Sequence, residues 1–161
     1  MKPVTVGLCA IAAACHDHTP AFSDAEMEEL KAEHPGMTEA CLGRLRRDGL
    51  VAWPARADEC FRMQSARHWH GLMGRGFELS RFCPAPASEC DYYSPGETIW
   101  MSSSPSAHWP SAVEAAGGVY EVEFIGRRTE LPGHFGHQSG YRYEMVVDRV
   151  ISVKEWTASA K

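Results

Sequence analysis

The chain has 161 residues, of which 44% are hydrophobic and 23% are charged, and its formal net charge is −5. This length suits one domain, and the hydrophobic fraction is sufficient for a core and excludes a disordered tail. The negative charge disfavours a general nucleic-acid binder, because such proteins neutralise phosphates with Lys and Arg. No apolar run is long enough to span a bilayer as a permanent helix.

Residues 1–18 carry the pattern of an export signal. The positively charged Lys2 is followed by a stretch without charged side chains, which ends at Ala14, directly before Cys15. This stretch resembles a bacterial lipoprotein signal with its lipobox, although Ala12 stands where Leu is usual. The resemblance implies a signal peptide over 1–14, acylation of Cys15 (for instance with palmitate) and attachment to a membrane. Ordinary secretory cleavage and a buried N-terminal strand or helix are the alternatives.

Residues 15–22 are expected to form a polar tether between the lipid and the folded chain. His16, Asp17 and His18 would bind a metal only weakly, and a solvated tether is the simpler interpretation. In some bacteria an Asp directly after the acylated cysteine influences membrane retention. Because His16 holds that position here, we expect an outer-membrane lipoprotein that faces the periplasm.

The remaining cysteines predict disulfides. Removal of the signal discards Cys9 and leaves four cysteines besides the acylated one, and an even number in an exported chain favours two bridges. Four cysteines allow three pairings. The short loop between Cys83 and Cys90 favours a local bridge there, which leaves Cys41 to pair with Cys60. A zinc site is the alternative, although no pair has the CxxC spacing that zinc modules favour.

Residues 23–65 are predicted to form a helical segment that packs on the rest of the domain. Ser23 and Glu26 match a capping box before a helix over 25–34, and a second helix begins near Thr38. Three arginines near the end of the second helix are expected to be solvated, where cations favour the helix dipole. Contact with an anionic ligand or a lipid headgroup is the alternative for these arginines, which are Arg44, Arg46 and Arg47.

Residues 66–156 have the pattern of strands. Alternation is clearest where Tyr120, Val122 and Phe124 share one face and charged side chains share the other. The predicted strands are 67–74, 77–83, 98–103, 119–128 and 142–155. A turn or short helix fills the longest connection, between the third and fourth strands. This arrangement predicts a small five-stranded OB-like barrel, mainly β with N-terminal helices, followed by a tail over 157–161.

Three sequence pieces carry a second resemblance, over about 66–155. They are Trp69-His70-Gly71-Leu72 with Phe77-Glu78-Leu79, then Ile99-Trp100-Met101, then Val122 to Gly126 with Gly133-His134-Phe135-Gly136 and a final strand. Their order resembles a group of bacterial envelope proteins that have OB-like barrels and a Gly-His-x-Gly motif. The stretch from His137 to Gly140 departs from that motif. The resemblance implies a fold and adds no catalytic residues.

Four histidines are candidate ligand or metal residues. His134 and His137 lie three apart in a glycine-rich loop, a spacing that can ligate a metal. His68 and His70 alternate with Trp69, so both are exposed if Trp69 faces the core. A structural loop, whose histidines cap carbonyl groups, is the simpler interpretation. The glycines expected to be structural are Gly71, Gly126, Gly133, Gly136 and Gly140.

Two carboxylates are the candidate bases if the histidines converge on zinc, namely Glu78 and Glu144. Glu78 lies in an otherwise apolar predicted strand, and we expect it to pair with Arg81 or Arg142. Four aromatic side chains are expected in the core or in a patch that binds peptide or glycan, and they would stack bases if the barrel bound single strands. These side chains are Tyr92, Tyr93, Trp100 and Trp109.

The function expected from the sequence is binding or assembly. No Gly-x-Ser-x-Gly elbow, P-loop, GxGxxG or EF-hand loop occurs in the chain. We therefore expect a membrane-anchored envelope lipoprotein that binds a protein or glycan partner, without a cofactor and without nucleic acid. A metal-dependent hydrolase is the first alternative. A cytoplasmic zinc protein or single-stranded nucleic-acid-binding protein is the second.

Overall fold

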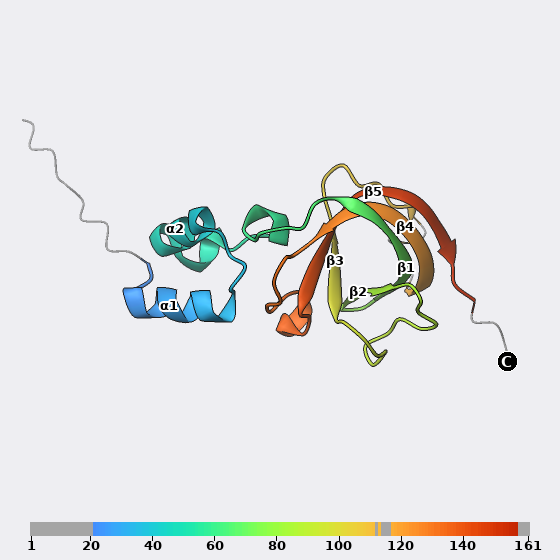
Figure 1. The fold of residues 1–161 in the computed structure, drawn as a ribbon, viewed down its shortest axis with the longest axis horizontal. Coiled ribbons are helices and arrows are strands. Elements are labelled where there is room, and N and C mark those ends of the chain that lie inside the picture. Colours follow the sequence, from blue (N-terminus) through green and yellow to red (C-terminus); the bar gives the residue numbers. More distant parts are fainter. Residues whose placement is uncertain (1–20, 112, 114–116, 158–161) are drawn as a thin grey trace, which may run out of the picture.

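The computed structural model describes residues 21–111, 113 and 117–157. The predicted signal peptide over 1–14, residues 15–20 of the predicted tether (Cys15 included) and most of the predicted tail lie outside these residues. Figure 1 shows an elongated molecule, with the helical segment at one end and the barrel at the other. None of the helices within the described ranges has the length and apolarity that a membrane span requires.

Two short helices form the N-terminal end of the described chain. Helix α1 spans Asp24–Glu33, and its N-terminus has the predicted capping box between Ser23 and Glu26. Helix α2 spans Glu39–Asp48, and the Thr38 side chain accepts a hydrogen bond from the backbone at its N-terminus. Two 3-10 turns follow on the way to the barrel, η1 over Gly49–Ala52 and η2 over Ala57–Glu59.

Five strands close into a barrel, as the sequence predicts. They are β1 (Arg67–Gly76), β2 (Leu79–Pro84), β3 (Ile99–Ser103), β4 (Gly118–Arg128) and β5 (Tyr143–Glu155). The order around the barrel is β1-β2-β3-β5-β4, with β4 paired back to β1. Only the β3–β5 pair is parallel. The fold is therefore mainly β, with a small OB-like barrel after two helices.

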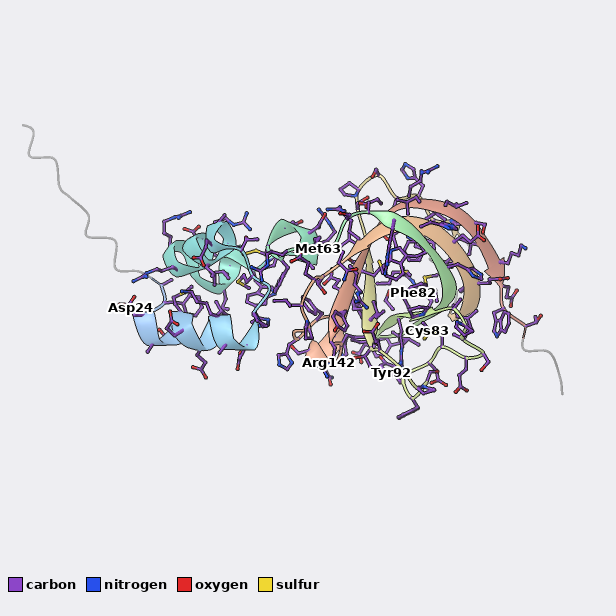
Figure 2. The ribbon with its side chains drawn as sticks, in the orientation of Figure 1. Asp24, Met63, Phe82, Cys83, Tyr92 and Arg142 are labelled. Atoms are coloured by element: carbon purple, nitrogen blue, oxygen red, sulfur yellow. A yellow bond between two sulfur atoms is a disulfide. The ribbon has the colours of Figure 1, made fainter. Side chains whose placement is uncertain are left out.

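The barrel core comes from the strand faces that alternation predicts. Along β4, Tyr120, Val122 and Phe124 are buried, while the residues between them are partly exposed. Trp69 lies in the same core, and its Nε1 donates to the Gly126 carbonyl at 3.1 Å. Figure 2 labels Phe82, which lies inside the barrel. Other core members are Met73, Ile99, Met101, Val113, Met145 and Val147.

Both predicted disulfides form with the favoured pairing. Cys41 on α2 is bonded to Cys60, and Cys83 at the end of β2 is bonded to Cys90. The first bridge joins two cysteines that are 19 positions apart in the sequence, and it links α2 to the chain that leads into β1. The second closes a separation of only 7 residues. One bridge therefore constrains each half of the molecule.

The helical segment packs against a loop of the barrel. Phe135, in the connection between β4 and β5, contacts Phe61 with ring centroids 5.0 Å apart, and Tyr141 joins the same core. An isolated bridge between Met63 and Thr129 continues the β4 backbone toward the helices. The other buried side chains of this core come from the helical segment. They are Met27, Met37, Cys41, Leu42, Leu45, Ala57 and Cys60.

Gly136 shows why the Gly-His-x-Gly motif needs its second glycine. Its φ is +66°, a left-handed conformation that side chains disfavour. A Cβ at this position would also lie 2.5 Å from the Trp100 ring. Gly71 is restricted differently, because a Cβ there would lie 2.3 Å from the Cys83 carbonyl oxygen on the neighbouring strand. At both positions the surroundings leave room for glycine alone.

Candidate functional site

The Gly-His-x-Gly loop turns back on itself beside the helical segment. Phe135 and Tyr141 exchange backbone hydrogen bonds of 2.9 and 3.1 Å, and the 3-10 turn η3 over His137–Ser139 lies between them. Phe135 is buried and anchors the loop, whereas His134 is exposed. The loop therefore presents His134 to the space between the two halves of the molecule.

A cleft of about 580 Å³ occupies this space, and we call it the His34 cleft. The helical segment and the barrel both contribute walls. The aromatic side chains that line it are Trp53, Phe61, Trp100 and Phe135. The polar side chains that line it include Glu33, His34, His134, Ser139 and Glu144. Ligand sites commonly combine apolar walls with a few polar groups in this way.

Glu144, on β5, is the most unusual polar group of the cleft. Only 7% of the residue is exposed. Its Oε1 accepts hydrogen bonds from the Ser102 hydroxyl at 2.6 Å and from the Ala57 N–H at 3.1 Å. Its Oε2 receives no hydrogen bond from the described residues and is not one of their fully buried polar atoms, so it faces the cleft. Burial raises the pKa of this carboxyl, although both hydrogen bonds oppose the shift.

His34 lies at the end of α1 and is buried among aromatic rings. Its ring centroid lies 5.2 Å from that of Trp53 and 6.1 Å from that of His134. The Nδ1 atom is buried and has no hydrogen-bond partner within the described chain. Burial lowers the pKa of His34, the nearby Glu33 opposes that shift, and His134 adds to it. The imidazole is therefore held toward its neutral form.

A second cleft, of about 710 Å³, opens on the barrel and is called here the Trp109 cleft. The β1–β2 turn forms one wall, and β3 with the residues that follow it forms the other. Trp109 donates from Nε1 to the Ser103 hydroxyl at 2.7 Å. Arg75 donates to the Ser80 hydroxyl at 3.3 Å. Trp100 lines both clefts.

The four candidate histidines do not gather at one place. On β1, His68 lies 3.9 Å from Glu123 and His70 lies 3.1 Å from Glu121, both across the exposed β1–β4 ladder. His137 instead lies 3.0 Å from Glu78, which is just beyond the other end of β1. Within the described ranges, no three His, Cys, Asp or Glu residues are grouped to hold a metal ion.

Two predicted ion pairs of Glu78 are wrong. Glu78 is not within a strand but in the β1–β2 turn, with φ of +57°, and its partner is His137. Arg81 is buried and donates to the backbone carbonyls of Asp91, Tyr92 and Ser94. The two terminal nitrogens of the guanidinium are satisfied by these carbonyls, whereas Nε is buried without a hydrogen-bond partner among the described residues. Among the described residues no ion pair joins Glu78 to Arg142.

The three arginines of α2 differ from one another. Arg44 donates to the Glu59 carbonyl at 3.2 Å and lies 3.2 Å from the Cys60 sulfur, so it is tied to the first disulfide rather than simply solvated. Arg46 forms an ion pair with Asp24. Arg47 is exposed, as predicted, and no hydrogen bond or ion pair joins it to the described residues.

The predicted aromatic patch is divided between two places. Trp100 and Trp109 line the clefts, whereas Tyr92 and Tyr93 are exposed on the loop between β2 and β3, and Figure 2 labels Tyr92 there. Sequence reasoning did not select His34 or Trp53 as site residues. Trp53 directly follows Gly49 and three apolar residues in the sequence. This apolar run was the only sequence signal that could have pointed to Trp53 as a site residue.

Comparison with known proteins adds no relative to this description. No protein-family model, curated protein or solved structure matches this chain. The site is therefore described from its own geometry.

Proposed function

We propose that this chain is a membrane-anchored binding module of the bacterial cell envelope, which holds a glycan or protein partner. The lipobox-like start supports the anchor, and two disulfides support an exported chain, because oxidised cysteines persist mainly outside the cytoplasm. The partner would lie in the His34 cleft. The proposal includes a periplasm-facing outer-membrane location and no cofactor.

One observation carries the binding role. Glu144 is buried, two donors fix its Oε1, and Oε2 faces an aromatic-lined cleft. Oε2 has no hydrogen-bond partner among the described residues, so in the free protein solvent in the cleft is what can hydrate it. A ligand hydroxyl or N–H that bonded to Oε2 would take the place of that solvent. The group is therefore preorganised for a polar ligand.

The lining favours a glycan over a peptide. Sugar rings present apolar C–H faces to aromatic side chains and hydroxyls to polar groups, and the cleft offers both kinds of surface side by side. Trp53 and Trp100 supply aromatic area, and Glu144, His134 and Ser139 supply hydrogen-bonding groups. An extended peptide would instead require an unpaired strand edge or a continuous apolar groove.

Calorimetry with an oligosaccharide of N-acetylglucosamine and a peptide of matched length tests this role. Trp53→Ala should weaken oligosaccharide binding about tenfold, the usual scale for loss of an aromatic anchor. Trp109→Ala, in the other cleft, is the matched control and should leave the affinity unchanged. If the peptide binds and the oligosaccharide does not, the partner is a protein. If neither binds, the role of the His34 cleft is wrong.

The pH dependence of binding tests the part played by Glu144. Above its raised pKa the carboxyl is ionised, and an ionised acceptor forms the stronger hydrogen bond to a sugar hydroxyl. Affinity of the wild type should therefore rise with pH through that range. Glu144→Gln keeps an oxygen acceptor for Ser102 and Ala57 but cannot ionise, so its affinity should not follow this rise.

Intact mass of the protein from the membrane fraction tests the anchor. A mass that corresponds to a chain beginning at an acylated Cys15 is expected. A chain that retains Met1, or one cleaved without acylation, would contradict the proposed lipid attachment while leaving the binding experiment valid.

A further inference from the structure

His34 lines the His34 cleft, and the structure holds it firmly in place. Only 8% of the residue is exposed. Its N–H donates to the Leu30 carbonyl at 3.0 Å, and its own carbonyl accepts from the Met37 N–H at 3.0 Å. Its ring packs against the rings of Trp53 and Phe61, with centroid distances of 5.2 and 6.0 Å. The imidazole is therefore restrained both through its backbone and through its ring.

The two ring nitrogens of His34 have different surroundings. Nδ1 is fully buried, and no hydrogen bond reaches it from the described residues. Nε2 also lacks a hydrogen bond within the described ranges, but it is not one of their fully buried polar atoms, so it faces the cleft. Burial lowers the pKa of His34, which favours the neutral ring with a single N–H.

The proton of this neutral ring belongs on Nε2. A buried N–H group without an acceptor is rarer in proteins than a buried acceptor without a donor, so an unpartnered Nδ1 favours the lone pair at that atom. In the neutral imidazole one nitrogen donates and the other accepts. His34 therefore directs one hydrogen-bond donor, with no charge, into the cleft.

A donor in these surroundings favours one kind of acceptor. A sugar hydroxyl that accepted this hydrogen bond would bring a proton of its own, and the rings of Trp53 and Phe61 beside His34 offer that proton no oxygen. A polar hydrogen without an acceptor is unfavourable in apolar surroundings. A carbonyl oxygen only accepts, so it can bond to Nε2 and leave no donor unpaired.

An acetamido group matches this wall of the cleft. Its carbonyl oxygen would accept from Nε2 of His34, and its methyl group would contact the neighbouring rings of Trp53 and Phe61. Glu144, on the wall that the barrel contributes, stays available for a hydroxyl of the sugar. The two walls together therefore fit a sugar ring that carries an acetamido group as well as hydroxyls.

We infer that His34 makes the cleft selective for glycans with N-acetylated amino sugars, through a hydrogen bond from Nε2 to the acetamido carbonyl. This inference rests on the proposed glycan-binding function. Glu144 and the aromatic lining contact hydroxyls and ring faces, which every hexose oligomer presents. His34 is the group that distinguishes an acetamido substituent from a hydroxyl.

Calorimetry with two oligosaccharides of equal length and linkage, one of N-acetylglucosamine and one of glucose, tests the selectivity. The wild type should bind the acetylated oligosaccharide about tenfold more tightly, the scale of one net hydrogen bond. His34→Phe keeps an aromatic ring but removes the donor, so this preference should largely disappear. The control His68→Phe replaces an exposed histidine on β1, outside the cleft, and should keep the full preference.

Nitrogen NMR of the wild type gives a second readout that does not depend on the folding of a variant. The acetylated oligosaccharide should shift the Nε2 resonance of His34, because the N–H gains an acceptor, and the glucose oligosaccharide should shift it less. An Nε2 resonance that is unchanged when the acetylated oligosaccharide saturates the protein would overturn the inference.

Failure of the selectivity and failure of the binding function give different results. If the wild type binds both oligosaccharides equally, the glycan-binding function stands and the role of His34 is wrong. If the preference persists in a folded His34→Phe, another group recognises the acetamido substituent, and the role of His34 is again wrong. If neither oligosaccharide binds, the proposed function fails and the inference fails with it.

Discussion

The helical segment and the barrel each contain one disulfide and one apolar core, but they are stabilised differently. The barrel closes through a continuous ladder of five strands around its own core. The core of the helical segment is smaller, and it is completed by Phe135 and Tyr141 from the barrel. Helices as short as α1 and α2 are marginal in isolation. The helical segment therefore depends on the barrel, whereas the barrel core contains no side chain from the helices.

Truncation of one aromatic ring in each region is the strongest test of this difference in stabilisation. Phe82→Ala removes a fully buried ring from the barrel core, and Phe135→Ala removes the ring that docks the helices. Each should lower the free energy of unfolding by about 3–5 kcal/mol in its own region. Hydrogen exchange should show loss of protection throughout the chain for Phe82→Ala, but only before residue 66 for Phe135→Ala. Equal loss in both variants would mean that the two regions unfold as one unit.

Removal of the first disulfide should have the next largest effect. Cys41→Ala/Cys60→Ala opens a loop whose ends are 19 positions apart in the sequence. Loss of this bridge should lower the free energy of unfolding by about 3 kcal/mol. The matched variant Cys83→Ala/Cys90→Ala opens a shorter loop and should cost less. Denaturant titration measures both losses. A larger loss from the second variant would contradict the expected dependence of the stabilisation on loop length.

The buried carboxyl of Glu144 makes stability fall as pH rises. Its folded pKa is raised above the ordinary value of 4.5, so the folded protein binds the proton more tightly than the unfolded chain does. This contribution is fully present near pH 4.5 and below, and it is lost as pH increases through the raised pKa. Glu144→Gln should therefore have a higher Tm than the wild type in mildly alkaline buffer, and the difference should shrink on acidification. A constant difference would show that ionisation is not its cause.

His34 acts in the opposite direction, at the contact between the two regions. Because its pKa is lowered from 6.5, the unfolded chain takes up the proton first as pH falls. Stability is therefore present above about pH 6.5 and is lost below it, as pH approaches the lowered pKa. His34→Phe should remove this part of the acid sensitivity. Thermal melts of both proteins between neutral and acid pH measure it, and parallel curves would contradict the role of His34.

Sequence pattern predicted the barrel well because its cause is local and periodic. The alternation along β4 matches the buried face of Tyr120, Val122 and Phe124, and the short loop between Cys83 and Cys90 favoured the local bridge that the structure has. The capping box at Ser23 likewise involves neighbours in the chain. Features that depend on a few adjacent residues could therefore be read directly.

The site could be predicted only in part because it is assembled from distant residues. Glu144 and Ala57 lie 87 positions apart, and their hydrogen bond exists only because the helical segment folds onto the barrel. His34 meets His134 for the same reason. Glu78 misled the prediction because β2 begins at Leu79, two residues later than the predicted strand, so Glu78 lies in the β1–β2 turn and its side chain reaches His137 and not an arginine.

Trp100 gives the two clefts a shared boundary. One indole lines both, and the backbone at Gly136 is pressed against it. A larger side chain at position 136 would displace this one indole, and the shape of both clefts would therefore change with a single substitution.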